Sequence, residues 1–268
     1  MPSPLYRKPI HIAGAPGRYS LYGTNPHHTT LLIVSPVAGL SAYERTAREL
    51  ARHSRVYLLE LPGGESTSRL PEGWDPDRYA DWVANWMNSI GLTHIHTLIG
   101  HSNSGPVVME LATRWPKRAG RLILAGSIGA EPKHTLLRVI LAYARGVTSE
   151  GTFPLRAFWI LLGNLVKQTA SLCHQRKLAL DKTFESLASR VNQPTILLWG
   201  RHDYLAGLNA PHRFAQWIGA NARIVWRKTG GHDWLIVEPQ TFAQTVHDQK
   251  NLGNSIPPPS LSPAPPSL

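Results

Sequence analysis

Short apolar segments that alternate with helical patterns predict a chain built from strands and helices in turn. The strand-like segments are rich in Val, Ile and Leu and are bounded by Gly, Pro and His. Between Tyr79 and Ile90, apolar side chains recur at the spacing of one helix face. We expect strands at 9–14, 18–23, 30–36, 55–61, 96–101, 121–126, 194–200 and 222–228, with further helices near 42–52, 105–115, 211–218 and 239–250.

This alternation predicts an α/β fold with a mostly parallel eight-stranded sheet and helices on both faces. The first two strands are separated only by Ala15, Pro16 and Gly17. A connection this short favours an antiparallel hairpin, which we expect at one edge of the sheet.

The alternation is interrupted once, between the sixth and seventh strands. Residues 132–192 contain apolar helical stretches and no convincing strand, so we expect a helical lid inserted into a core domain formed by 1–131 and 193–251. The segment 252–268 has no charged residue and contains "IPPPSLSPAPPSL", which predicts a disordered, proline-rich tail.

Composition favours one large domain that folds around its own core. Of the 268 residues, 42% are hydrophobic and 17% are charged, which is ordinary for a well-cored protein. No apolar run reaches the ~18 residues of a membrane span, and we expect no secretory signal because the first residues lack an uninterrupted apolar block. The single cysteine, Cys173, excludes an intrachain disulfide and favours a reducing, cytoplasmic compartment.

A net charge of +11 raises the question of an anionic partner. The basic residues are not gathered in one run and no nucleic-acid-binding signature is present, so we expect no nucleic-acid partner. Between Lys133 and Arg190 there are nine Lys/Arg and three Asp/Glu, a balance of +6. A solvated basic face is the default interpretation, and attraction to anionic substrates or to an acidic membrane surface is the alternative.

One strand-to-helix turn carries a candidate nucleophile. The stretch "TLIGHSNSGPVV", from Thr97 to Val108, runs from an apolar strand through small residues into a helix. If Ser102 is the tip, the flanking positions are small enough for a sharp turn, whereas a tip at Ser104 would place Pro106 and Val107 there. Ser102 is therefore the candidate, and Ser104 is interpreted as a small turn residue.

The segment Gly100–Gly105 resembles the nucleophile elbow of the α/β-hydrolase family, G-x-S-x-G, with Ser104 in place of the last glycine. The family supplies its triad in the order Ser, acid, His, each from a loop after a strand. Asp203 follows the strand "PTILLWG", and His232 follows the strand "ARIVWRK". Asp233, beside the histidine, is a weaker competitor for the acid, and the sixth strand ends without one.

The resemblance also implies an oxyanion hole formed by two backbone N–H groups. Asn103, directly after the serine, is expected to supply one of them. The second would come from the loop after the third strand, where Val37 is expected because Pro36 has no N–H. The stretch "LLELPGGESTS" also resembles a loop of the family in which an acidic residue, here Glu60, is followed by x-Pro-Gly and then a serine. We interpret this loop as structural. His101 and His202, which adjoin proposed catalytic residues, are likewise interpreted as structural.

A serine nucleophile suits esters, thioesters, lactones and certain carbon–carbon cleavages. The resemblance therefore implies a serine hydrolase that cleaves a small-molecule carboxylic ester or thioester, or a lactone, with an apolar acyl part. Hydrolytic carbon–carbon cleavage of a ring-fission product is one alternative. A ligand-binding receptor on the same fold, without turnover, is another. We expect no cofactor and no metal.

Overall fold

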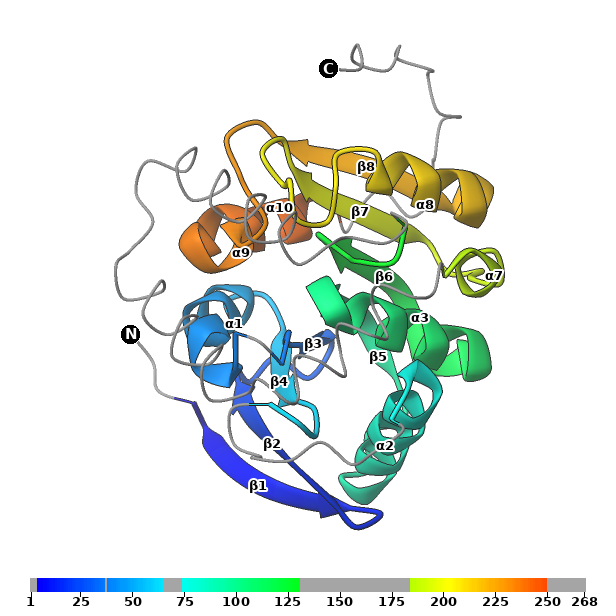
Figure 1. Cartoon of the computed structure of the whole chain (residues 1–268). Coiled ribbons are helices and arrows are strands. Elements are labelled where there is room, and N and C mark those ends of the chain that lie inside the picture. Colours follow the sequence, from blue (N-terminus) through cyan, green and yellow to red (C-terminus); the bar gives the residue numbers. More distant parts are fainter. Residues whose placement is uncertain (1–3, 37, 65–73, 131–183, 250–268) are drawn as a thin grey trace.

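The computed structural model describes residues 4–36, 38–64, 74–130 and 184–249. Eight strands form one sheet in the order β1-β2-β4-β3-β5-β6-β7-β8 (Figure 1). Strands β3 to β8 are parallel to one another, and β2 is antiparallel to both β1 and β4. The predicted α/β fold, with an antiparallel hairpin at one edge of a mostly parallel sheet, is confirmed.

The elements follow the predicted order closely. The strands are β1 (Tyr6–Ile12), β2 (Ala15–Tyr22), β3 (Thr29–Ile33), β4 (Arg55–Glu60), β5 (Ile95–His101), β6 (Ala119–Ala125), β7 (Thr195–Gly200) and β8 (Ala222–Arg227). The described α-helices are α1 (Glu44–Leu50), α2 (Pro76–Ser89), α3 (Gly105–Arg114), α7 (Glu185–Ala188), α8 (Ala210–Ile218), α9 (Trp234–Val237) and α10 (Pro239–Asp248), and the 3₁₀ turns are η1 (Leu40–Tyr43), η2 (Ser102–Ser104), η3 (Pro116–Arg118) and η4 (Gly219–Asn221).

The first hairpin turns two residues earlier than the sequence predicts. Its loop is Ala13–Gly14, and the predicted loop residues 15–17 begin β2 instead. Both loop residues have positive φ, at 49° and 78°, which is the conformation that matches the twist of a two-residue hairpin. Gly17 is needed inside the strand because a Cβ there would lie 2.4 Å from the ring of Trp82.

Helices cover the sheet on both faces, and the strand side chains alternate between two cores. Leu31 belongs to the core that includes residues of α2, α3 and α8, whereas its neighbour Leu32 belongs to the core that includes residues of α1, α9 and α10. All of β3 and β7 is buried, as expected for strands with both faces covered. In Figure 1 these two groups of helices lie on opposite sides of the sheet.

Part of the predicted lid segment packs on the main domain. Phe184, Leu187, Ala188 and Val191 are buried in the core that contains α3 and α8. The rest of the predicted lid, the predicted proline-rich tail and Cys173 lie outside the described residues. None of the helices within the described ranges has the length and apolar character needed to cross a membrane.

Glu110 on α3 is a buried acid that should make stability depend on pH. Its carboxylate lies 3.6 Å from the guanidinium of Arg190. Burial, and then the neighbouring Asp77, raises the pKa of Glu110 to about 7. Because this folded pKa lies above the unfolded one, the stabilising contribution is present in acid and is lost as the pH rises through 7.

Replacing Glu110 by glutamine removes this titration. The free energy of unfolding of E110Q should therefore increase relative to the wild type between pH 4.5 and pH 8, by about 1 kcal/mol or more. Urea unfolding at the two pH values measures the change. E185Q removes an exposed carboxyl from neighbouring α7 and serves as the control. An equal difference from the wild type at both pH values would show that Glu110 is ionised alike in the folded and unfolded states.

Candidate active site

Ser102 lies at the sharp turn between β5 and α3. His101 ends the strand, and Ser102 opens the short turn η2 that leads into the helix. The φ angle of Ser102 is 54°, a left-handed value that is rare for a residue with a side chain. Such strain is found where the surrounding fold holds a functional side chain in place.

Small residues around Ser102 make this turn possible. A Cβ on Gly100 would lie 2.7 Å from Val108 of α3, and one on Gly105 would lie 1.7 Å from the hydroxyl of Ser127. Ser104, which stands where the family pattern has glycine, is fully buried and donates its hydroxyl hydrogen bond to the carbonyl of Val34 over 2.7 Å. Ser104 thus ties the turn to the loop after β3.

Asp203 lies in the loop after β7, where the sequence places the candidate acid. It is 1% exposed, and its backbone N–H donates to the carbonyl of Gly200 over 3.1 Å. The backbone N–H of Ala206 donates to its Oδ1 over 2.9 Å. The first bond holds the backbone of the loop and the second orients the carboxyl group, both independently of the histidine.

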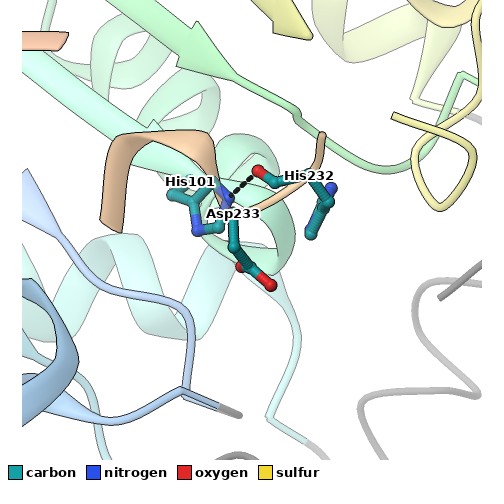
Figure 2. A group of neighbouring side chains, drawn as sticks. All are labelled: His101, His232 and Asp233. Carbon is teal, nitrogen blue, oxygen red and sulfur yellow. Dashed lines mark hydrogen bonds between the residues drawn. The ribbon is translucent and has the colours of Figure 1, made fainter. Parts of the chain in front are cut away.

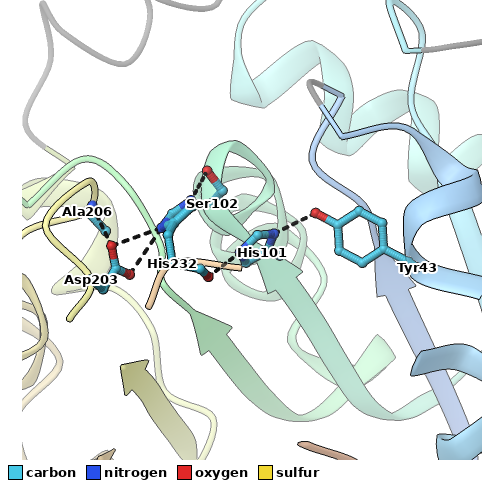
Figure 3. Close-up of polar contacts among 6 residues, drawn as sticks. All are labelled: Tyr43, His101, Ser102, Asp203, Ala206 and His232. Atoms are coloured by element: carbon cyan, nitrogen blue, oxygen red, sulfur yellow. Dashed lines mark hydrogen bonds and ion pairs between the residues drawn. The ribbon is translucent and has the colours of Figure 1, made fainter. Parts of the chain in front are cut away.

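His232 bridges the candidate acid and the candidate nucleophile (Figure 3). Its Nδ1 lies 3.0 and 3.1 Å from the two carboxyl oxygens of Asp203, and its Nε2 lies 3.0 Å from the Oγ of Ser102. Because an ionised carboxylate only accepts, Nδ1 carries the proton and Nε2 is left to accept from the serine hydroxyl. The structure thus brings together all three residues that the sequence nominates.

Glycines allow the loops that carry Asp203 and His232 to approach each other. A Cβ on Gly126, at the end of β6, would lie 2.8 Å from the carboxyl of Asp203 and 3.2 Å from the ring of His232. A Cβ on Gly200 would lie 2.0 Å from the carbonyl oxygen of Gly230. Side chains at either position would push the acid and the base apart.

The expected oxyanion donors are only partly described. Asn103 follows Ser102 within η2 and is half-buried, and its expected role as a donor stays a prediction. Val37 lies outside the described residues, so its expected N–H donor stays a prediction. The start of the same loop is described, and there the backbone N–H of Ser35 donates to the hydroxyl of Tyr43 over 3.3 Å.

Asp233, the competing acid, is buried beside the candidate triad. Burial raises the pKa of its carboxyl, and the negative charge of Asp203 adds to the effect against the opposing influence of His232. In Figure 2 this carboxyl extends away from the hydrogen bond between His101 and His232. The imidazole Nδ1 of His232 contacts Asp203, so Asp203 is the carboxylate placed to orient it.

His101, His232 and Asp233 form a group whose ligand atoms lie within 4.8 Å of one another, a spacing that a metal ion could use. All four ring nitrogens of the two histidines already have hydrogen-bond partners. Metal binding would therefore have to break the contacts that align Ser102 and Asp203. The chemistry of this group fits proton transfer better than metal binding.

Sequence reasoning does not find Tyr43, which carries no local signal. The interpretation of His101 as structural does not specify its partners either. The Tyr43 hydroxyl lies 2.5 Å from Nδ1 of His101, and Nε2 of His101 lies 3.1 Å from the backbone carbonyl of His232. Figure 3 shows this line of contacts running from Tyr43 to the candidate triad. The available signal is a histidine directly before the candidate nucleophile.

The geometry supports nucleophilic chemistry at a carbonyl or similar carbon. A serine hydroxyl becomes a useful nucleophile when a base takes its proton and an acid orients that base. Ser102, His232 and Asp203 have the distances that these three roles require.

Comparison with known proteins is consistent with this geometry. A family model described as "Alpha/beta hydrolase family" matches residues 12–245. The "Putative carbamate hydrolase RutD" of Pseudomonas savastanoi pv. phaseolicola is 26% identical over 82% of this chain and 93% of its own length. A 2-hydroxy-6-oxononadienedioate/2-hydroxy-6-oxononatrienedioate hydrolase of Pseudomonas putida is 26% identical over 72% of this chain and 76% of its own.

The fold is shared with solved structures. The enol-lactonase from Burkholderia xenovorans LB400 superposes with a TM-score of 0.74 at 19% identity, covering 90% of this chain and 98% of that one. At this identity the likeness concerns the fold alone.

Proposed function

The chain belongs to the alpha/beta hydrolase family and is a hydrolase, and we propose that it is a serine hydrolase acting on a carboxylic ester or thioester. The observation that supports this proposal most is the 3.0 Å distance between Ser102 Oγ and His232 Nε2, with Asp203 hydrogen-bonded behind the imidazole. A nucleophile, a base and an orienting acid at these distances match what acyl transfer requires.

The three residues have distinct roles in the proposed reaction, and His232 acts both as base and as acid. His232 takes the hydroxyl proton as Ser102 Oγ attacks the carbonyl carbon, and Asp203 stabilises the imidazolium that forms. The tetrahedral intermediate collapses as His232 protonates the leaving alcohol or thiol, which leaves an acyl group on Ser102. Water then gives a proton to His232 and attacks the acyl carbon. The acid leaves as Oγ regains its proton.

The oxyanion would be held by backbone N–H groups rather than by a metal. We propose Asn103 and Val37 as the donors. Asn103 has the position in the chain that the elbow geometry uses. A small molecule with an apolar acyl part, a lactone included, is the proposed substrate class.

Hydrolytic cleavage of a carbon–carbon bond is the second candidate. The specific observation in its favour is the 26% identity to the Pseudomonas putida hydrolase over 72% of this chain. In that reaction the same three residues would activate water or the serine against a carbonyl carbon, and the leaving group would be a carbanion instead of an alcohol.

Labelling with a fluorophosphonate tests the class of protein, because this reagent phosphonylates an activated serine. We expect one adduct, on Ser102, located by peptide mass spectrometry. A chain-length series of nitrophenyl esters and acyl thioesters, run beside a dienoic ring-fission ketone, then separates the two reactions. Faster cleavage of the ketone would favour the second candidate. Folded protein without an adduct and without turnover would favour a ligand-binding receptor.

A further inference from the structure

A line of three hydrogen bonds, two of them buried and the third partly buried, runs behind Ser102. It joins the Ser35 N–H to the Tyr43 hydroxyl, the Tyr43 hydroxyl to His101 Nδ1, and His101 Nε2 to the His232 carbonyl. Tyr43 is 0% and His101 is 1% exposed, so water does not compete for the two bonds that the Tyr43 hydroxyl makes. Figure 3 shows the part of the line from Tyr43 to His232.

The direction of each bond follows from its chemistry. The carbonyl of His232 can only accept, so Nε2 of His101 must carry a proton and donate it. Burial lowers the pKa of His101 well below its usual value, and the positive charge of a protonated His232 acts the same way. The ring is therefore neutral, its Nδ1 accepts from Tyr43, and the tyrosine oxygen accepts from the Ser35 N–H.

The two ends of the line are parts of the backbone that the reaction depends on. Ser35 belongs to the loop after β3, from which the second oxyanion donor is proposed to come. His232 carries the proposed base. The middle of the line, His101, is bonded covalently to Ser102. A single chain of contacts thus links three segments that are far apart in the sequence. Each segment carries, or adjoins, a group proposed to act in the reaction.

We propose that Tyr43 and His101 are positioning residues. They hold the His232 loop and the loop after β3 at fixed positions on either side of Ser102. This inference rests on the function proposed above. Neither residue touches the substrate in this role, so their loss should lower kcat and leave KM nearly unchanged. A misplacement of ~1 Å of a catalytic group costs up to ~100-fold in rate.

Three variants separate the contacts. Y43F removes only the hydroxyl, which leaves the Ser35 N–H without this acceptor and His101 without this donor. H101F removes both ring nitrogens. H101Q keeps an N–H donor near the position of Nε2, so it should recover part of what H101F loses. We expect kcat to fall about 10-fold in Y43F and about 100-fold in H101F, with H101Q between H101F and the wild type.

Thr46 offers a matched control. Its buried hydroxyl donates over 2.7 Å to the carbonyl of Leu235, three residues after His232, but it has no part in the line. T46V therefore removes a buried side-chain-to-carbonyl bond in the same region. Its kcat should stay within about twofold of the wild type, although its melting temperature falls.

Two measurements test whether Tyr43 and His101 are positioning residues. The first is the split between kcat and KM for a short nitrophenyl ester. The second is the downfield proton resonance of the His232 Nδ1–H that is bonded to Asp203, which should shift or broaden in Y43F and H101F and stay unchanged in T46V. Folded Y43F and H101Q with the kcat and the resonance of T46V would overturn the inference, even if H101F failed to fold.

The resonance needs no turnover, so the inference and the proposed function fail separately. A wild type that neither hydrolyses esters nor takes up fluorophosphonate would overturn the function, and the resonance would still report whether Tyr43 and His101 position the imidazole.

Discussion

Replacing Ser102 by alanine is expected to abolish fluorophosphonate labelling and to lower kcat for ester hydrolysis by at least about 10⁴-fold. The variant removes only Oγ, the atom that lies 3.0 Å from His232 Nε2. Alanine tolerates the φ of 54° at this position no worse than serine does, so the fold should survive. Steady-state kinetics and intact-protein mass spectrometry measure the two losses, and circular dichroism confirms that the variant is folded.

Ser104 provides the control for this experiment, because it lies two residues away in the same turn. S104A removes the hydroxyl that donates to Val34, which should cost about 1 kcal/mol of stability and a modest part of the activity. It should still be labelled, on Ser102. Retention of full activity in S102A, or loss of labelling in S104A alone, would show that Ser102 is not the nucleophile.

Asp203→Asn is expected to have the second large effect, a fall in kcat of about 10⁴-fold. Its carboxyl accepts from His232 Nδ1 and from the Ala206 N–H. An amide can present its N–H₂ to the ring, which favours the tautomer with the proton on Nε2 and removes the acceptor that Ser102 needs. Activity measured against pH, together with the melting temperature, separates this loss from unfolding.

Asp233→Asn is the matched control, since Asp233 is also a buried carboxyl beside His232. Burial raises the pKa of Asp233, so a neutral amide replaces a group whose charge the site already disfavours. We expect a change in kcat of less than about tenfold. If D233N proves as inactive as D203N, the assignment of the orienting acid to Asp203 alone is wrong.

The local pattern of apolar residues is sufficient to predict the strands of the sheet. The apolar run before Gly100 and the run before Arg201 are each recognisable without knowledge of any partner, because burial on both faces requires an apolar side chain at nearly every position. The predicted hairpin loop lies two residues after the observed loop. Pro16 and Gly17 are residue types typical of a turn. Only the packing of Trp82 against Gly17 shows why they lie inside a strand.

The candidate triad could be nominated from the sequence for a related reason. Ser102, Asp203 and His232 each follow a recognisable strand, and parallel strands bring their carboxyl ends to one edge of the sheet. Chain order and strand position together therefore predict proximity. Tyr43 follows no such rule, because it lies in η1 after a loop, and nothing near it in the sequence indicates a bond to His101.

The sequence by itself determined the order of the strands and helices, the turn that holds Ser102 and the candidate base His232, and it left Asp203 and Asp233 as candidates for the acid. These depend on the period of apolar residues, on small residues at one turn and on the positions that follow each strand. Only the tertiary structure decided which carboxylate, Asp203 or Asp233, bonds to His232, and that His101 joins Tyr43 to the loop of the base. Those choices depend on side-chain directions across distances of a few ångströms, between residues up to 131 positions apart, as His101 and His232 are. No local pattern encodes such directions, because they result from the simultaneous packing of many elements.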